Sequence, residues 1–300
     1  MDRKSVVAVG RKSIGLVAGA LACLLAAPAH AGEATLYRDT WGVPHVYADT
    51  EAAGYYALGY AQAEDRLVDI FLAIREATGR MAEVKGKGAI ESDYLMRLFH
   101  NDTLHEKYLA TAPNHVQDAI RGFAAGIRTY IAEHPDEAAE VKIEIEDWHP
   151  LAVGRAMILR WPIGTMMGDL RSAVEPVKPA MGSNQWAVAP KRSADGRAIL
   201  LSDPHLTWEG IAVLYESRLH AGAMHTNGYS LIGTPMMAIG HNQHTGWALT
   251  TGGPDTSDVY RIEFRTEPRL EYRYDDKWKP VRATEFTFAV KDSDPVTTLA

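Results

Sequence analysis

The chain has 300 residues, enough for two average domains or one large layered domain. Apolar residues make up 46% of it and charged residues 23%, the ordinary composition of a globular protein with a sizeable core. The formal net charge of −7, without any cluster of lysine and arginine, argues against binding to nucleic acid.

Residues 1–31 are typical of a Sec-type signal peptide. Basic residues near the N-terminus precede an apolar run over residues 14–27, and Ala29-His30-Ala31 supplies a small-x-small cleavage pattern. A membrane anchor is the weaker interpretation because the apolar run is short for spanning a bilayer. We therefore expect cleavage after Ala31 and a periplasmic or secreted protein with no membrane contact in its mature form.

Removal of this segment changes the charge and the redox chemistry of the chain. Four basic residues and Asp2 are lost, so the net charge of −7 becomes −10. Cys23, the only cysteine, is lost as well. The mature chain would then form no disulfide and offer no thiolate as a nucleophile or metal ligand.

Helical periodicity dominates residues 32–175. Apolar residues recur at spacings of three and four over residues 52–83 and 114–133, which predicts two helices with a buried face. Asn114 is the expected N-cap of the second helix, and Pro135 closes the segment. A third apolar run over residues 153–167 is also predicted to be helical.

From residue 183 the pattern becomes that of short strands separated by turn signals. The expected strands are residues 185–189, 197–201, 212–219, 236–239, 247–250 and 259–264, with further strands over 270–300. A helical part followed by a run of strands predicts an α+β or layered fold rather than alternating βαβ units. Residues 176–182, with proline and glycine, are expected to form an exposed linker, where chains are readily cut.

Ser183 stands at this boundary. A serine hydroxyl is a poor nucleophile without a base, and no G-x-S-x-G elbow surrounds Ser183. An N-terminal serine can use its own α-amino group, whose pKa of roughly 7.7–8.0 lets it accept a proton near neutral pH. Cleavage before Ser183 would create such a terminus, and Gly182 tolerates the strained backbone that self-cleavage needs. An ordinary serine at a strand entry is the alternative.

Several segments together carry a more specific pattern. They are residues 38–46 (RDTWGVPHV), 59–67 (GYAQAEDRL), 79–83 (GRMAE), 182–188 (GSNQWAV), 201–206 (LSDPHL), 240–242 (GHN) and 250–258 (TTGGPDTSD). In this order they resemble the penicillin acylase family of N-terminal nucleophile (Ntn) hydrolases, and the match covers nearly all of residues 35–265. The resemblance implies an α+β fold, the four-layer αββα sandwich, in which a helical α-chain (32–175) precedes a β-rich β-chain (from 183).

The resemblance also implies roles for individual residues. The bond between Gly182 and Ser183 would be the self-cleavage site, and Ser183 would be the nucleophile and, through its amine, the general base. His205 would orient the Ser183 hydroxyl, with a purely structural histidine as the alternative. Thr251 would contribute its backbone N–H to the oxyanion hole.

A calcium site and an acyl pocket follow from the same resemblance. The implied calcium ligands are Asp255, Ser257 (through its carbonyl), Asp258 and, more weakly, Glu175. Carboxylates with carbonyl oxygens suit Ca²⁺, although the two aspartates could instead cap a turn. Met166 and Leu170 fall near positions that line the acyl pocket, with helix-core residues as the alternative.

The predicted protein is an exported amidohydrolase that cuts itself into an α-chain/β-chain heterodimer. It would cleave the amide of a small N-acylated substrate, such as a β-lactam side chain, without an organic cofactor. The alternative within the class is an N-acyl homoserine lactone acylase, which would quench quorum signals.

Two hypotheses that place the chain in other classes of protein compete with this prediction. One is a non-catalytic secreted binding protein in which Ser183 is inert. The other is a metallohydrolase that uses Asp203, His205, His241 and His244, which is disfavoured because these histidines lack H-x-x-x-H spacing. The resemblance also places a side-chain oxyanion asparagine and an arginine beyond residue 300. We therefore expect the N-terminal portion of a longer protein, or a truncated pseudo-enzyme.

Overall fold

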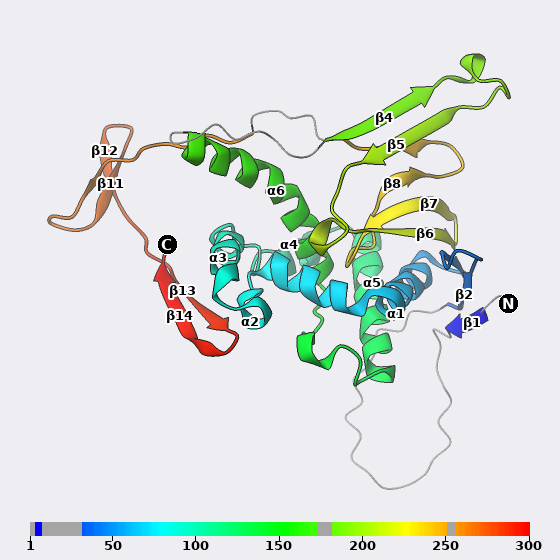
Figure 1. The fold of residues 1–300 in the computed structure, drawn as a ribbon, viewed down its shortest axis with the longest axis horizontal. Helices are drawn as coiled ribbons and strands as arrows, with labels where there is room; N and C mark the ends of the chain where they lie inside the picture. Colours follow the sequence, from blue (N-terminus) through cyan, green and yellow to red (C-terminus); the bar gives the residue numbers. More distant parts are fainter. Residues whose placement is uncertain (1–3, 8–31, 173–181, 251–255) are drawn as a thin grey trace, which may run out of the picture.

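The computed structural model describes residues 4–7, 32–172, 182–250 and 256–300. Its α-helices all precede residue 173, and after residue 182 the regular structure is mainly strand, which confirms the predicted α+β class. Helices α1 and α5 lie together on one side of a seven-stranded sheet (Figure 1). The helices are α1 (Glu51–Thr78), α2 (Ala82–Lys85), α3 (Ile90–Leu98), α4 (His105–Thr111), α5 (Asn114–Glu133) and α6 (His149–Ser172).

The seven-stranded sheet has the order β1-β2-β3-β6-β7-β8-β9. Only the β3–β6 pair is parallel, and the helices lie between these two strands in the chain. Leu219 and Ala221 on β6 face α1, where a Cβ on Gly54 would touch both side chains. The strands are β1 (Lys4–Val7), β2 (Ala34–Arg38), β3 (Pro44–Ala48), β6 (Leu214–Ala221), β7 (Met224–Leu231), β8 (Met237–His241) and β9 (Gly246–Trp247).

Three smaller sheets complete the described chain. The hairpin of β4 (Ser183–Val188) and β5 (Ile199–Pro204) extends beside the large sheet, and many of its side chains, such as Trp186 and Leu201, are exposed (Figure 1). The others are β10 (Phe264–Arg265) with β11 (Glu271–Tyr274) and β12 (Lys277–Pro280), and β13 (Glu285–Val290) with β14 (Ser293–Leu299). The described chain also contains the 3-10 turns η1 (Lys87–Ala89), η2 (Ala139–Val141), η3 (Pro190–Arg192) and η4 (Gly210–Ala212).

Helix α1 is the centre of the core. Thr50 caps its N-terminus by accepting a hydrogen bond from the Ala53 amide at 3.2 Å, and Gly79 ends it with φ +64°. Glycines allow α5 to approach closely: a Cβ on Gly59 would lie 2.1 Å from the carbonyl oxygen of Phe123, and one on Gly126 would lie 2.0 Å from that of Tyr56. Any larger residue at either position would force the two helices apart.

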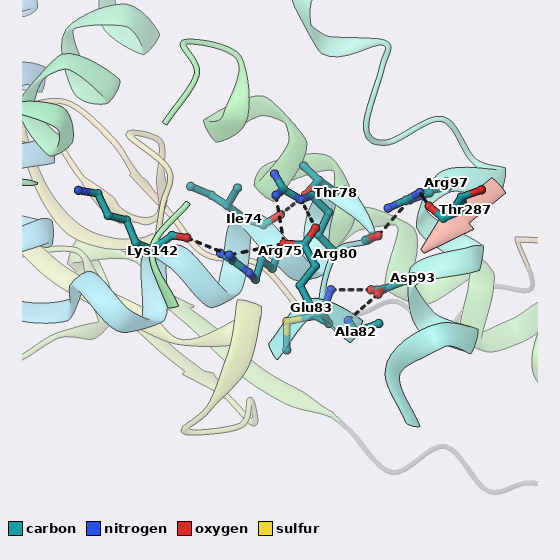
Figure 2. Close-up of polar contacts among 12 residues, drawn as sticks. Ile74, Arg75, Thr78, Arg80, Ala82, Glu83, Asp93, Arg97, Lys142 and Thr287 are labelled. Atoms are coloured by element: carbon teal, nitrogen blue, oxygen red, sulfur yellow. Dashed lines mark hydrogen bonds and ion pairs between the residues drawn. The ribbon is translucent and has the colours of Figure 1, made fainter. Parts of the chain in front are cut away.

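A polar network joins the end of α1 to α2, α3 and β13 (Figure 2). The Asp93 carboxylate accepts hydrogen bonds from the amides of Met81 and Ala82 at 2.9 and 2.7 Å, and so satisfies donors at the start of α2. Arg97 donates to the carbonyl oxygens of Gly79 and Thr287 at 3.0 and 2.7 Å. The guanidinium therefore ties the C-terminal hairpin to the helical part.

The structure confirms the three predicted helices and corrects several details. The first helix ends at Thr78 rather than at residue 83, because Gly79 caps it in a left-handed conformation. Asn114 is the first helical residue of α5, not its cap, because Pro113 already holds the extended conformation that precedes a helix. The strand predicted over residues 259–264 is wrong except at its end, because strand structure begins only at Phe264, next to which the Arg273 amide donates to the Glu263 carbonyl oxygen. Strand β7 was not predicted, because its sequence MHTNGYSL is largely polar.

The predicted signal peptide and linker fall mostly outside the described residues. Of residues 1–31 only 4–7 are described, and they pair with β2. Of the linker only Gly182 is described. No helix in the described ranges is both long enough and apolar enough to cross a membrane. Export and cleavage after Ala31 stay predictions.

Candidate active site

Ser183 is the first residue of β4, and Gly182 immediately precedes the strand. The hairpin register pairs Ser183 with Pro204, which brings the residue after β5 alongside Gly182. The backbone N–H of His205 donates to the Gly182 carbonyl oxygen at 3.2 Å, and the Ser183 hydroxyl donates to the same oxygen at 2.6 Å. The predicted scissile carbonyl is thus polarised by two donors, one of which is the hydroxyl of the predicted nucleophile.

The His205 side chain belongs to a small polar cluster at this bond. Its Nε2 lies 3.0 Å from Asp203 Oδ2 and 3.2 Å from Asn184 Nδ2, and Asn184 donates to the same Asp203 oxygen at 3.1 Å. Hydrogen bonds from Asn184 and then from His205 lower the pKa of the Asp203 carboxyl below its ordinary value. The ionised carboxylate favours the tautomer with the proton on Nε2.

This tautomer leaves Nδ1 as the basic nitrogen of His205. A Cβ on Gly182 would lie 3.8 Å from that Nδ1, so the nitrogen faces the Gly182–Ser183 segment. The structure therefore brings Gly182, Ser183 and His205 together, as expected. Asp203 and Asn184 complete the cluster. Sequence reasoning did not assign them this role, although both lie within segments that carry the resemblance.

Thr250 supplies a further contact to the candidate nucleophile. Its hydroxyl donates to the Ser183 carbonyl oxygen at 3.1 Å, which ties the segment after β9 to the first residue of β4. Thr251, the predicted oxyanion donor, lies outside the described residues. Its role in the oxyanion hole stays a prediction.

The predicted calcium ligands are only partly described. Asp255 and Glu175 lie outside the described residues. The Ser257 hydroxyl donates to the Pro162 carbonyl oxygen of α6 at 2.8 Å, and Asp258 is exposed. In the described ranges no three His, Cys, Asp or Glu side chains are grouped to hold a metal ion.

A cavity of about 200 Å³ lies between α6 and the segment that follows β5. It is lined by Met157, Arg160, Trp161, Leu206 and Ala212. One of the lining residues, Leu206, directly follows His205 in the chain. The predicted pocket residues Met166 and Leu170 lie farther along α6 and do not line it in the described structure; Leu170 is exposed. Met157 and Trp161 are one helical turn apart in the sequence, and this spacing could have indicated that they line the cavity together.

Two polar networks, one buried and one partly buried, hold the sheet against α1. Gln62 donates to the Ser230 hydroxyl at 3.0 Å and accepts from the Gly233 amide at 3.0 Å. The Tyr215 hydroxyl donates to Asp65 at 2.6 Å, and burial, followed by the charge of Asp65, raises the pKa of that tyrosine. These contacts fix β6 and β7, the centre of the large sheet, on the helical layer.

Comparison with known proteins places the chain in a family. The family model Penicillin amidase matches residues 33–300. The chain is 28% identical, over an alignment 331 residues long, to the penicillin acylase 2 proenzyme of Pseudomonas sp. (strain SE83), covering 89% of this chain and 42% of that protein. It is 26% identical to the acyl-homoserine lactone acylase PvdQ of Pseudomonas fluorescens (strain Pf0-1), covering 87% of this chain and 38% of that protein.

A solved structure also matches: the thermostable penicillin G acylase from Alcaligenes faecalis in its tetragonal form, at 23% identity and a TM-score of 0.38 over 48% of this chain and 86% of that one. The chain spans about two fifths of the length of the curated relatives named above. Because the family model matches nearly the whole chain in one stretch, the chain belongs to the penicillin amidase family.

Proposed function

We propose that the protein cleaves the bond between Gly182 and Ser183 and then hydrolyses the amide bond of a small N-acylated molecule. The observation that carries this proposal is the arrangement at that bond. The Ser183 hydroxyl lies 2.6 Å from the Gly182 carbonyl oxygen, which also accepts the His205 N–H. Family membership supports the same chemistry.

In the self-cleavage step, Ser183 Oγ adds to the Gly182 carbonyl carbon as the hydroxyl proton leaves. The His205 N–H stabilises the negative charge that develops on the carbonyl oxygen. The C–N bond then breaks and the freed nitrogen of Ser183 takes the proton, which leaves an ester. Water hydrolyses the ester and releases Ser183 with a free α-amine.

The mature site uses that α-amine as its base. It accepts the proton of Ser183 Oγ while the oxygen attacks the substrate amide, and the departing amine takes this proton as its C–N bond breaks. Water then attacks the acyl-enzyme with the α-amine again as the base, which releases the carboxylic acid and restores the Ser183 hydroxyl. His205, held by Asp203, orients the serine hydroxyl, and Thr251 supplies an oxyanion N–H.

The cavity beside Leu206 supports an acyl group as the part of the substrate that is recognised. Three of its lining side chains are large and apolar, and apolar linings favour an aliphatic or aromatic acyl chain. The leading substrate class is a β-lactam with an acylated amine. Acyl-homoserine lactones are the second candidate, since the relatives that match include acylases of both names.

Export, the α-chain/β-chain heterodimer and a structural Ca²⁺ complete the proposal. Asp258 and Ser257, with the predicted ligands Asp255 and Glu175, offer the hard oxygen donors that calcium prefers. In that role calcium would stabilise the segment after β9 against α6. Removal of calcium with a chelator should then lower the unfolding temperature without changing the mass of either chain.

The first test is the N-terminal sequence and intact mass of every chain in the purified protein. A fragment that starts Ser183-Asn184-Gln185 is expected, and Ser183→Ala should abolish it while the turn variant Ser193→Ala should not. A purified precursor should cleave at a rate independent of its concentration, as an intramolecular reaction requires. A single uncut chain that starts at Gly32 would overturn self-processing and favour the hypothesis of a non-catalytic binding protein.

The second test separates the substrate classes. The cleaved protein is offered N-acyl homoserine lactones and acylated β-lactams with acyl groups from acetyl to dodecanoyl, and the released amine is measured. Release from one class with Ser183 present, and none with Ser183→Ala, assigns the substrate. If the protein cleaves itself before Ser183 but releases no amine from either class of compound, both substrate classes are refuted.

A further inference from the structure

The large sheet has a second face, turned away from α1, that the site around Ser183 does not use. Because Leu219 and Ala221 face α1, the alternate residue His220 faces the other way. In register, Tyr47 of β3 pairs with His220 of β6, and His220 pairs with His225 of β7. These three side chains therefore form one row across three strands.

The turn between β6 and β7 sets the spacing of the two histidines. Only Gly222 and Ala223 separate the strands, and Gly222 has the positive φ of +56° that such a turn needs at its first position. The pair beyond the one that closes a two-residue turn is non-hydrogen-bonded, and its side chains approach closely. His220 and His225 are that pair, and their Nδ1 atoms lie 3.0 Å apart.

Neighbouring rings hold these nitrogens in position. The imidazole of His220 stacks on Tyr47 with ring centroids 4.8 Å apart and planes 6° apart. The His225 ring stands at 90° to that of His220, with centroids 5.0 Å apart. Both histidines are half-buried, so the facing nitrogens are oriented by the fold but can be reached from solvent.

Two imidazole nitrogens this close must share either a proton or a cation. With metal–nitrogen bonds of about 2.0–2.1 Å, a separation of 3.0 Å subtends an angle of roughly 91–97° at the metal. That angle is close to the 90° between neighbouring ligands of a tetragonal ion and below the tetrahedral angle that zinc prefers. Imidazole ligands and tetragonal geometry together favour Cu²⁺ and Ni²⁺, with Cu²⁺ the tighter.

We propose that His220 and His225 form a two-histidine chelate for a tetragonal divalent transition-metal ion, Cu²⁺ above all. Both rings would carry their proton on Nε2 and present Nδ1 to the metal. In the described part of the chain no third His, Cys, Asp or Glu completes the group, so water fills the remaining positions and the ion exchanges readily. The bound ion would clamp β6 to β7 on the face opposite α1.

The test is a titration of the untagged protein with Cu²⁺, followed by electron paramagnetic resonance and by calorimetry. The unmodified protein should bind one equivalent at this site, with a spectrum that shows coupling to two nitrogen nuclei. His220→Gln and His225→Gln should each weaken this site about tenfold or more, while His115→Gln, on the exposed start of α5, should not change it. Zn²⁺ should bind more weakly than Cu²⁺ at the same site.

Two outcomes would overturn the proposal. One is a spectrum of the unmodified protein with one or no coupled nitrogen, which would show that the pair shares only a proton. The other is equal Cu²⁺ affinity in the two variants and the control. Far-UV circular dichroism confirms that each variant is folded, and the spectrum of the unmodified protein decides the question even where a variant fails to fold.

Discussion

Replacing Gly126 with alanine tests the close crossing of α1 and α5. The new Cβ would lie 2.0 Å from the carbonyl oxygen of Tyr56 and 2.8 Å from the amide nitrogen of Tyr60. Relief of these contacts requires the helices to separate by about 1 Å in a core that is packed as densely as an organic crystal. Neither atom belongs to a side chain, so no rotation can relieve the clash.

The magnitude follows from two opposing terms. Overpacking costs ~1–3 kcal/mol, and contact with rigid backbone places this site near the upper end, at ~3 kcal/mol. Alanine in a helix interior regains ~1 kcal/mol relative to glycine. We therefore expect Gly126→Ala to lower the free energy of unfolding by about 2 kcal/mol.

Gly154 in α6 is the matched control, because a Cβ there would meet no atom within 4 Å. Gly154→Ala should raise the free energy of unfolding by ~0.5–1 kcal/mol through helix propensity alone. The assay is urea unfolding followed by far-UV circular dichroism and by tryptophan fluorescence, whose transitions must coincide for a two-state analysis. Equal stabilities of Gly126→Ala and Gly154→Ala would refute the close crossing.

Three further predictions concern buried polar groups and the candidate site. Gln62→Leu should lower the free energy of unfolding by about 2–4 kcal/mol, because it leaves the Ser230 hydroxyl and the Gly233 amide buried without a partner. Gln243→Leu, in an exposed turn, is the control. Equal urea midpoints for the two variants would contradict the network. Burial lowers the pKa of both His105 and His149 to about 4. As the pH falls, the two histidines bind protons in the unfolded chain before they do so in the folded protein. Their contribution to the free energy of unfolding is therefore complete above pH ~6.5 and is lost as the pH falls toward 4. Urea midpoints should fall over that window, and less so in His149→Gln; a flat profile would refute the buried neutral imidazoles. Asp203→Asn should slow amide hydrolysis by the cleaved protein about tenfold or more, because an amide no longer selects the His205 tautomer that orients the Ser183 hydroxyl, whereas Asp195→Asn should leave the rate unchanged. Release of the amine product over time measures this rate, and equal rates would remove the His205 side chain from the reaction.

Much of the site was readable from short segments of sequence. Gly182, Ser183 and His205 were named in advance, and the β4–β5 register brings them together because a hairpin places residues that are close in sequence opposite each other. The contact from Thr250 to Ser183 could not be read in this way. It joins residues far apart in the chain, and nothing in the local pattern specifies that distance.

The sequence by itself determined the helices, the order of a helical part before a strand-rich part, and the residue at the start of β4. These follow from periodicity and turn chemistry, which act over a few residues. Tertiary structure alone decided the parallel pairing of β3 with β6, the polar strand β7, the lining of the cavity by Trp161 and Leu206, and the facing nitrogens of His220 and His225. Each of these depends on which distant segment lies alongside, and that choice is made by burial of the whole core rather than by local preference.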